Sequence, residues 1–473
     1  MGTINSAFSL ISGALDADQS ALSIVANNVA NANTPGYATE IPNWQENQPV
    51  TINGVSYGAG VTETGATSLR DRVLEERLDQ QQQLASSSGA RLTALGSVQA
   101  LFTPDSGSAS AAVGDIGSDI TSFFNSFSSL EAAPSNSSLR EEVLSSARTL
   151  AGDVSNAAAS LNTQRSALDQ EASDVTSQVN SLTTAIAQLN QQIQTTSPNG
   201  DAGTLEDQRQ QDLSQLSQLI GINQVQTERN GLSVTTTSGQ ALVSEGTSFQ
   251  LTSGTEGGVT NFFVGNMNIT TQLASGGGEL GGYLTARDQD IPSALNALDQ
   301  LAYSVSTQVN AQNNAGTDLD GLTGTVANPL NIFSQPATVA GSAVAMSVVM
   351  TDPNQIAAAA AGAGTGDNTN TTAMANLANQ NIVGGQTPTD FFSNFVSTLG
   401  ATASGVQADN TAQNASVTQL QTQNNALSGV NLNDEAAAMS TLQNSYEAAS
   451  QVFSLLNTVM ESALNLGQQT TVS

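Results

Sequence analysis

The stretch ANNVANANTPGY, residues 26–37, places four asparagines within seven residues, directly before a Pro-Gly pair. The later asparagines and Thr34 carry side chains that compete with helical hydrogen bonds, and Pro35-Gly36 suits the centre of a type II turn. The stretch therefore predicts the end of a helix. Asn27 and Asn28 precede this end and lie on the helix itself, where we expect their amides to bond specific partners.

Upstream of this stretch, apolar residues recur at spacings of three, four and seven, as in a heptad repeat with one polar position at Asp18. These apolar residues are Ile4, Phe8, Ile11, Leu15, Leu22, Val25 and Val29. The pattern predicts one amphipathic helix that runs through Val29.

The last forty residues show the same spacing almost without a break. Asn433, followed by Asp434 and Glu435, predicts the start of a helix, because it offers a side-chain cap and early negative charge. Apolar stripes more often face the core of their own domain. Because both stripes lie at extreme termini, where chains more often fray, we expect them to pack on each other. The C-terminal stripe comprises Leu432, Ala436, Met439, Leu442, Tyr446, Ala449, Phe453, Leu456, Met460 and Ala463.

The composition limits the class of protein. A length of 473 residues usually makes about three domains, but only 38% of the residues are hydrophobic and 4% are aromatic. We therefore expect long, thin packing built from small aliphatic contacts. The formal net charge is -30, and all ten basic residues are arginine. Nucleic acid and anionic membrane surfaces are poor partners for such a chain.

Missing residue types exclude several kinds of site. Without cysteine, histidine or lysine, the chain has no disulfide, thiolate zinc site, Ser-His or Cys-His couple, or lysine nucleophile. The first residues lack the basic region of a signal peptide, and no run of about 18 apolar residues is present. We expect a soluble chain, or one that leaves the cell by another route.

Carboxylate pairs are the remaining candidates for acid-base chemistry. Glu75-Glu76 and Glu141-Glu142 lie next to arginines, and neighbouring helical positions point about 100° apart, so we interpret both pairs as solvated faces. Asp318-Leu319-Asp320-Gly321 resembles the opening of a calcium loop but lacks the later ligands. GAGTGD (362–367) resembles a phosphate loop without the strand-turn-helix context. We expect turns at both places, and no catalytic residue, metal or cofactor.

The expected fold class is α+β, mainly α, with three parts. They are a terminal coiled-coil layer (1–40 and 428–473), an elongated helical rod domain (65–221, 288–315 and 389–427), and an inserted small β-rich outer domain (222–287 and 316–388). Alternating residues around Asn230-Gly231 predict a β-hairpin with a type I′ turn. AVAMSVVMTD (343–352) predicts another strand.

ANNVANANTPGY resembles the N-terminal signature of the axial proteins of the bacterial flagellum, the family of rod, hook and hook-associated proteins. Residues 428–466, with a Gly-Val-Asn-Leu entry and the acidic pair Asp434-Glu435, resemble the matching C-terminal signature. Interior segments such as SLRDRVLEERLDQQQ (68–82) and VNSLTTAIAQLNQQI (179–193) come in the order found in the hook-associated protein 1 group. The resemblance covers nearly the whole chain. The stretch 321–391 is compact, so an outer domain carried by some members is expected to be reduced or missing.

The resemblance implies a structural adaptor, not an enzyme, which joins the hook to the filament and permits filament assembly. It implies synthesis in the cytoplasm, export by the flagellar type III secretion apparatus, and an extracellular location at the hook-filament junction. The implied partners are further copies in a helical ring, hook protein, hook-associated protein 3 and a cytosolic export chaperone, with no nucleic acid and no membrane insertion. A hook or distal-rod structural protein of the same axial family is the alternative, but it should lack the ordered interior segments.

The implied assembly interface consists of apolar and amide residues on the two terminal helices. These are Ile4, Phe8, Ile11, Leu15, Leu22, Val25, Asn27, Asn28, Val29, Leu432, Met439, Leu442, Tyr446, Phe453, Leu456 and Met460. Four of them, Leu442, Tyr446, Phe453 and Leu456, are also expected to bind the export chaperone before assembly.

Overall fold

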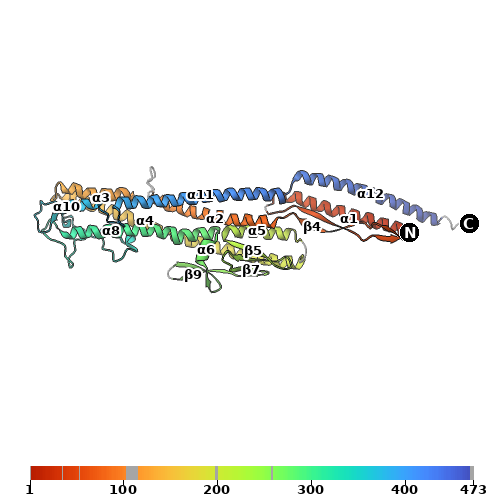
Figure 1. The fold of residues 1–473 in the computed structure, drawn as a ribbon, viewed down its shortest axis with the longest axis horizontal. Helices are drawn as coiled ribbons and strands as arrows, with labels where there is room; N and C mark the ends of the chain where they lie inside the picture. Colours follow the sequence, from red (N-terminus) through yellow and green to blue (C-terminus); the bar gives the residue numbers. More distant parts are fainter. Residues whose placement is uncertain are drawn as a thin grey trace.

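The computed structural model describes residues 2–34, 36–52, 54–102, 115–197, 201–256 and 259–468. The molecule is elongated, its helices run along the long axis, and both chain ends lie at the same end (Figure 1). The fold is mainly α with small sheets, which confirms the predicted class. The long helices are α1 (Gly2–Asn31), α2 (Arg72–Ala100), α3 (Ile116–Glu131), α4 (Ser137–Thr196), α5 (Thr204–Leu219), α8 (Ile291–Ala315), α11 (Pro388–Ser428) and α12 (Leu432–Gln468).

Helices α1 and α12 pack against each other at one end of the molecule, as expected from the two terminal stripes. Beside α1 lies a ribbon of short strands that was not expected from the sequence. Strand β1 pairs with β4, and β2 pairs with β3, both antiparallel. We call α1, the ribbon and α12 the terminal layer. The strands of the ribbon are β1 (Glu40–Glu46), β2 (Val50–Ile52), β3 (Val55–Tyr57) and β4 (Val61–Ser68).

The helical rod is built on α2 and α11, which pack together along its length, and on α3, α4 and α8. Its helices begin at side-chain caps, since Asp71, Asp115 and Asn136 accept hydrogen bonds from first-turn N–H groups of α2, α3 and α4. The rod has two hydrophobic cores. One contains the contacting rings of Phe123, Phe127 and Phe333, and the other lies where α4 and α5 meet the β-rich part.

The β-rich part protrudes from the side of the rod (Figure 1). The predicted hairpin of β5 and β6 is present, but its turn lies one residue earlier than expected. Positive φ values occur at Arg229 (58°) and Asn230 (60°), as in a type I′ turn. Gly231 is needed for space instead, because a Cβ there would clash with Gln194 and Thr227. The strands are β5 (Ile222–Gln226), β6 (Leu232–Thr236), β7 (Ala241–Ser244), β8 (Thr247–Ser248), β9 (Leu251–Glu256), β10 (Val259–Val264) and β11 (Met267–Asn268), in the orders β5-β6-β7-β8 and β11-β10-β9.

The glycine-rich stretch after β11 is helical, which corrects the expectation that β structure continues to residue 287. It forms α6 (Thr270–Gly276), α7 (Gly278–Thr285) and the π-helical turn η1 (Ala286–Asp290) that leads into α8. A Cβ at Gly282 would clash with the carbonyl oxygen of Ser87. The glycine therefore lets α7 approach α2 closely. This packing favours a helix although glycine itself has a low helix propensity.

Residues 316–388 contain little β structure, so the expectation that they form the second half of a β-rich domain is wrong. The predicted strand at 343–352 is absent, and α9 begins there instead. Asp299 of α8 accepts hydrogen bonds from the N–H groups of Gly341 (2.9 Å) and Ala343 (2.8 Å) and so holds the start of α9. The elements are β12 (Gly316–Thr317), α9 (Ser342–Ala345), η2 (Pro353–Gln355), β13 (Ala359–Ala360), α10 (Thr369–Asn376) and η3 (Leu377–Asn379).

Candidate assembly site at the chain ends

The two terminal helices meet along the stripes read from the sequence. Near the chain ends, the rings of Phe8 and Phe453 contact edge to face, with centroids 5.3 Å apart. At the other end of the pair, Asn28 donates to Glu435 Oε1 at 3.1 Å. These two contacts fix the antiparallel register of α1 and α12. We call the line of contact between the helices the terminal seam.

The terminal seam is incompletely buried. Of its apolar members, Val25 is buried and most of the others are half-buried. Val29, Leu432 and Tyr446 are exposed and so extend beyond the seam. Ile4 lies on α1, and its side chain lies outside the part of the chain that the structure describes. The half-buried members are Phe8, Ile11, Leu15, Leu22, Met439, Leu442, Phe453, Leu456 and Met460.

Helix α12 has a second apolar face, next to the seam, that is exposed. Val452, Leu455 and Val459 follow each other at spacings of three and four, and all three are exposed, Leu455 by 65%. A helix with apolar residues on two faces needs a second partner to bury both. The terminal layer as a single copy therefore leaves substantial apolar surface open to solvent.

Asn28 explains why an amide stands before the helix end. It is buried, and it donates to Glu40 O at 2.9 Å as well as to Glu435. Its Oδ1 accepts from Tyr37 Oη at 2.6 Å and from the N–H of Glu40 at 3.0 Å. One side chain thus joins α1, the following turn, the ribbon and α12. Asn27 is different, because it accepts only a local bond from Asn31, at 2.9 Å.

The start of α12 is capped two residues earlier than expected. Asn431, not Asn433, supplies the cap, and its Oδ1 accepts from the N–H of Asn433 at 3.1 Å. Just before it, Ser428 at the end of α11 donates to Leu69 O at 3.0 Å and accepts from the N–H of Thr39 at 2.8 Å. The break between α11 and α12 is therefore tied to both ends of the ribbon.

A buried ionic network connects the terminal layer to the rod. Arg70 forms ion pairs with Glu75, at 2.6 Å, and with Asp207, and it donates to Gly36 O at 3.2 Å. Glu75 is therefore buried and paired, which corrects its interpretation as part of a solvated face. Burial raises the pKa of Glu75, and it raises the pKa of Asp207 to about 6, although Arg70 opposes both shifts.

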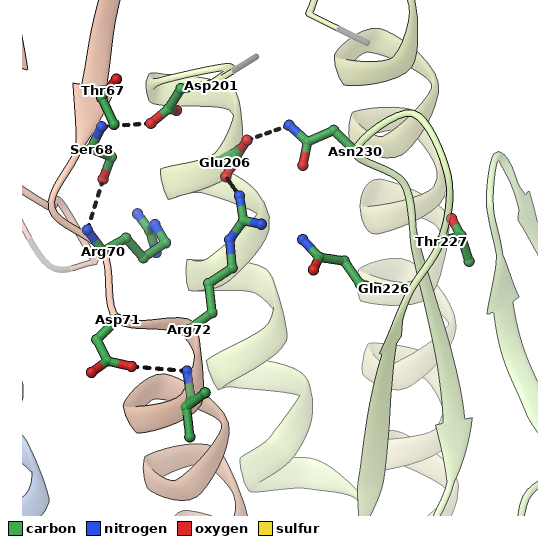
Figure 2. Close-up of a pocket in the computed structure, with 11 residues that line it drawn as sticks. Thr67, Ser68, Arg70, Asp71, Arg72, Asp201, Glu206, Gln226, Thr227 and Asn230 are labelled. Atoms are coloured by element: carbon green, nitrogen blue, oxygen red, sulfur yellow. Dashed lines mark hydrogen bonds and ion pairs between the residues drawn. The ribbon is translucent and has the colours of Figure 1, made fainter. Parts of the chain in front are cut away.

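The same network continues to the β5–β6 turn. Arg72 pairs with Glu206 at 2.7 Å, and Asn230 donates to the same carboxylate. Burial alone would raise the pKa of Glu206, but the Asn230 bond and the Arg72 pair together hold it below its ordinary value. A cavity of about 800 Å³ opens beside these groups, bordered by Ser68, Val73 and Thr227 (Figure 2). The carboxylates along it are bonded, so the arrangement holds elements together and offers no free acid-base pair.

The two candidate ligand loops considered from the sequence are turns, whereas Glu141 and Glu142 lie exposed on α4. Asp318 Oδ1 accepts from the N–H groups of Asp320 (3.0 Å) and Leu322 (2.7 Å), which is the geometry of an Asx turn. Asp367 accepts from the N–H groups of Ala360 and Thr369. Among the described residues, there is no group of three or more potential metal-ligating His, Cys, Asp or Glu side chains. Within that same part of the chain, no helix combines the length and apolarity needed to span a membrane.

Comparison with known proteins agrees with this geometry. The family described as "Flagellar hook-associated protein FlgK helical domain" matches residues 108–326, and "Flagella basal body rod protein" matches residues 11–37. The latter match includes the quoted asparagine stretch. A solved structure of the flagellar hook junction protein FlgK from Burkholderia pseudomallei superimposes with a TM-score of 0.64 at 20% identity, over 75% of this chain and 100% of that one, which shows the shared fold.

Relatives named "Flagellar hook-associated protein 1" align over almost the full length. The protein of Salmonella typhimurium is 26% identical over 96% of this chain and 98% of its own length. The Escherichia coli protein is 24% identical with the same coverage, and the Bacillus subtilis protein is 27% identical over 96% of both chains. Over almost its full length, this chain is therefore similar to proteins named Flagellar hook-associated protein 1.

Proposed function

We propose that this chain is a structural adaptor of the bacterial flagellum that joins the hook to the filament and permits filament assembly. The observation that carries the proposal is the half-buried terminal seam together with the second apolar face of α12. A surface of this kind is completed by neighbours that carry the same two helices. Head-to-tail contacts between such copies generate helical arrays.

The partners that fit this role are further copies of the chain, hook protein on one side and hook-associated protein 3 on the other. The chain acts outside the cell, at the junction, after export by the flagellar type III secretion apparatus. A cytosolic export chaperone covers α12 beforehand, through Leu442, Tyr446, Phe453 and Leu456. The support for this step is the exposure of α12, since an uncovered apolar helix would otherwise associate non-specifically.

The role is structural and not catalytic. The support is chemical: the chain has no cysteine, histidine or lysine, and the clustered carboxylates of the ionic network are bonded to arginine and amide groups. The function therefore depends on surfaces and on rigidity.

The test is electron microscopy of flagella from the source strain deleted for this gene, with flagellin measured in the culture medium. We expect hooks of normal length without filaments, and monomeric flagellin lost to the medium. Return of the gene on a plasmid should restore filaments. Missing or truncated hooks would instead indicate a hook or distal-rod protein, and intact motile flagella would refute the adaptor role.

A further inference from the structure

The tip of the ribbon, formed by β2 and β3, carries an apolar face that stays exposed in the described part of the chain. Val50 lies directly opposite Tyr57, and the strand register places Val55 on the same side. These side chains are 48% (Val50), 52% (Tyr57) and 53% (Val55) exposed. An isolated two-stranded hairpin is only marginally stable in water, so a covering partner would stabilise this tip.

The partner of the ribbon tip is not the chain's own rod. The base of the ribbon lies at Asn28, and Gly60 near the tip lies against Leu10. The ribbon therefore runs back along α1 toward the N-terminus, away from α2 (Figure 1). Since no described part of the chain covers the tip, we expect its partner on another molecule.

Charge indicates what that molecule presents. All ten arginines lie between Arg70 and Arg287, so the terminal layer has no basic side chain. Glu46 is exposed at the end of β1, close in sequence to the tip. A surface that supplies cations would be complementary to it. The carboxylates of residues 1–69 and 429–473 are Asp16, Asp18, Glu40, Glu46, Glu63, Asp434, Glu435, Glu447 and Glu461.

A matching surface exists on the rod, where it meets the terminal layer. Val73 is 63% exposed, and Arg77 lies one helical turn further on the same side of α2. Arg72 is half-exposed, and Arg229 is exposed in the β5–β6 turn across the cavity of Figure 2. Neither Arg77 nor Arg229 forms an ion pair with a described residue. We call Arg72, Val73, Arg77 and Arg229 the arginine face.

We propose that the ribbon tip of one copy docks on the arginine face of a second copy. Tyr57 packs on Val73 and on the guanidinium of Arg72, while Glu46 lies toward Arg77 and Arg229. Tyrosine and arginine are the residue types that most often dominate interface energy, and a guanidinium over an aromatic ring is favourable. The contact joins different surfaces of the two copies, so repetition extends it into an array. The inference rests on the proposed function, because it assumes that copies assemble.

The absence of cysteine allows a direct test by cross-linking. A full-length chain carrying Val55→Cys and Val73→Cys is expressed in the deletion strain, and isolated flagella are oxidised. We expect a ladder of disulfide-linked multimers, at least tenfold stronger than with Val55→Cys and Met267→Cys, since Met267 is an equally exposed residue on the β-rich part. Both replaced valines are exposed, so folding should be unaffected.

Each outcome decides the proposal. Filaments without a ladder would overturn the docking but leave the adaptor role intact. A disulfide-linked dimer from Val55→Cys alone would mean that tips pair with each other, which also overturns it. Charge reversal gives an independent check: Glu46→Arg should reduce filament number severalfold, and adding Arg77→Glu and Arg229→Glu in the same chain should restore it. Glu46→Arg with unchanged filament number would count against the ribbon contact, whether its partner is a second copy or hook protein.

Discussion

Asn28 shows how much a single buried amide contributes to the terminal layer. Asn28→Ala removes four hydrogen bonds and leaves the N–H of Glu40, Glu435 and Tyr37 without this partner. Each unsatisfied buried group costs roughly 1–3 kcal/mol. We expect hydrogen exchange in residues 26–40 and 429–440 to rise by at least tenfold. Asn27→Ala is the matched control, because Asn27 has only local bonds, and equal effects of both variants would contradict the role of Asn28.

Asp79 predicts an unusual dependence of stability on pH. It accepts from Gln210 (3.0 Å) and Gln224 (2.8 Å), and burial raises its pKa to about 7. The unfolded value is about 3.9, so the folded state binds more protons between these pH values. This contribution to stability is complete near pH 4 and is lost as the pH rises through about 7.

Asp79→Asn keeps an acceptor for the two glutamines and removes the charge. We expect the free energy of unfolding at pH 8 to rise by up to about 4 kcal/mol, the equivalent of the pKa difference, with no gain near pH 4. Thermal unfolding at both pH values measures this. Asp174→Asn, at an exposed carboxylate on α4, should change neither. An equal gain at pH 4 and pH 8 would refute the titration of Asp79.

At the scale of elements, the sequence predicts long helices well and their partners less well. The stripes of α1 and α12 are periodic over many turns, so helix type follows from spacing. Their mutual packing was expected because both stripes lie at the chain termini. The ribbon was missed although VTINGVSY alternates around Asn-Gly, because the strands are too short to stand out beside the helical signals. Helix α7 depends on close packing against the backbone of Ser87, and helix α9 depends on the carboxylate of Asp299. Both groups are distant in sequence, so no local pattern predicts these helices.

The same limit applies to the assembly site. The spacing identified most of the residues that lie along the seam, and the asparagine pair indicated a bonded amide, which is Asn28 and not Asn27. It did not identify Glu435 as the partner, nor Arg70 as the residue that holds Gly36, because these contacts join segments hundreds of residues or several elements apart.

A substitution at Leu456 tests the proposal that the apolar stripe of α12 binds first the export chaperone and later its neighbours in the assembly. The side chain is half-buried in the terminal seam, so Leu456→Asp would place an unpaired charge against α1. We expect at least a tenfold loss of affinity for the export chaperone and no incorporation into flagella. Asn457→Asp adds the same charge at an exposed neighbouring position and should leave both unchanged. Normal assembly of the Leu456 variant would refute the proposal that one stripe serves both partners.

At the scale of the whole molecule, the rod and the terminal layer differ in how they are stabilised. Both hydrophobic cores lie within residues 94–406, whereas the terminal layer buries few large side chains. We expect a chain truncated to residues 69–428 to fold, with its main unfolding transition within about 3 °C of the full-length protein. Calorimetry checks this. Truncation before α11, which packs along α2, should abolish the transition, and an equal collapse of the 69–428 chain would show that the ends are part of the core.

Trp44 on β1 has a practical consequence. It is the single tryptophan of the chain, and its side chain is 50% exposed. Indole emission shifts to shorter wavelength when water is removed from the ring, so tryptophan emission, excited selectively beside the five tyrosines, reports on the ribbon. The wavelength of Trp44 emission can therefore be followed in unlabelled protein while subunits assemble, and it would report whether the ribbon becomes covered.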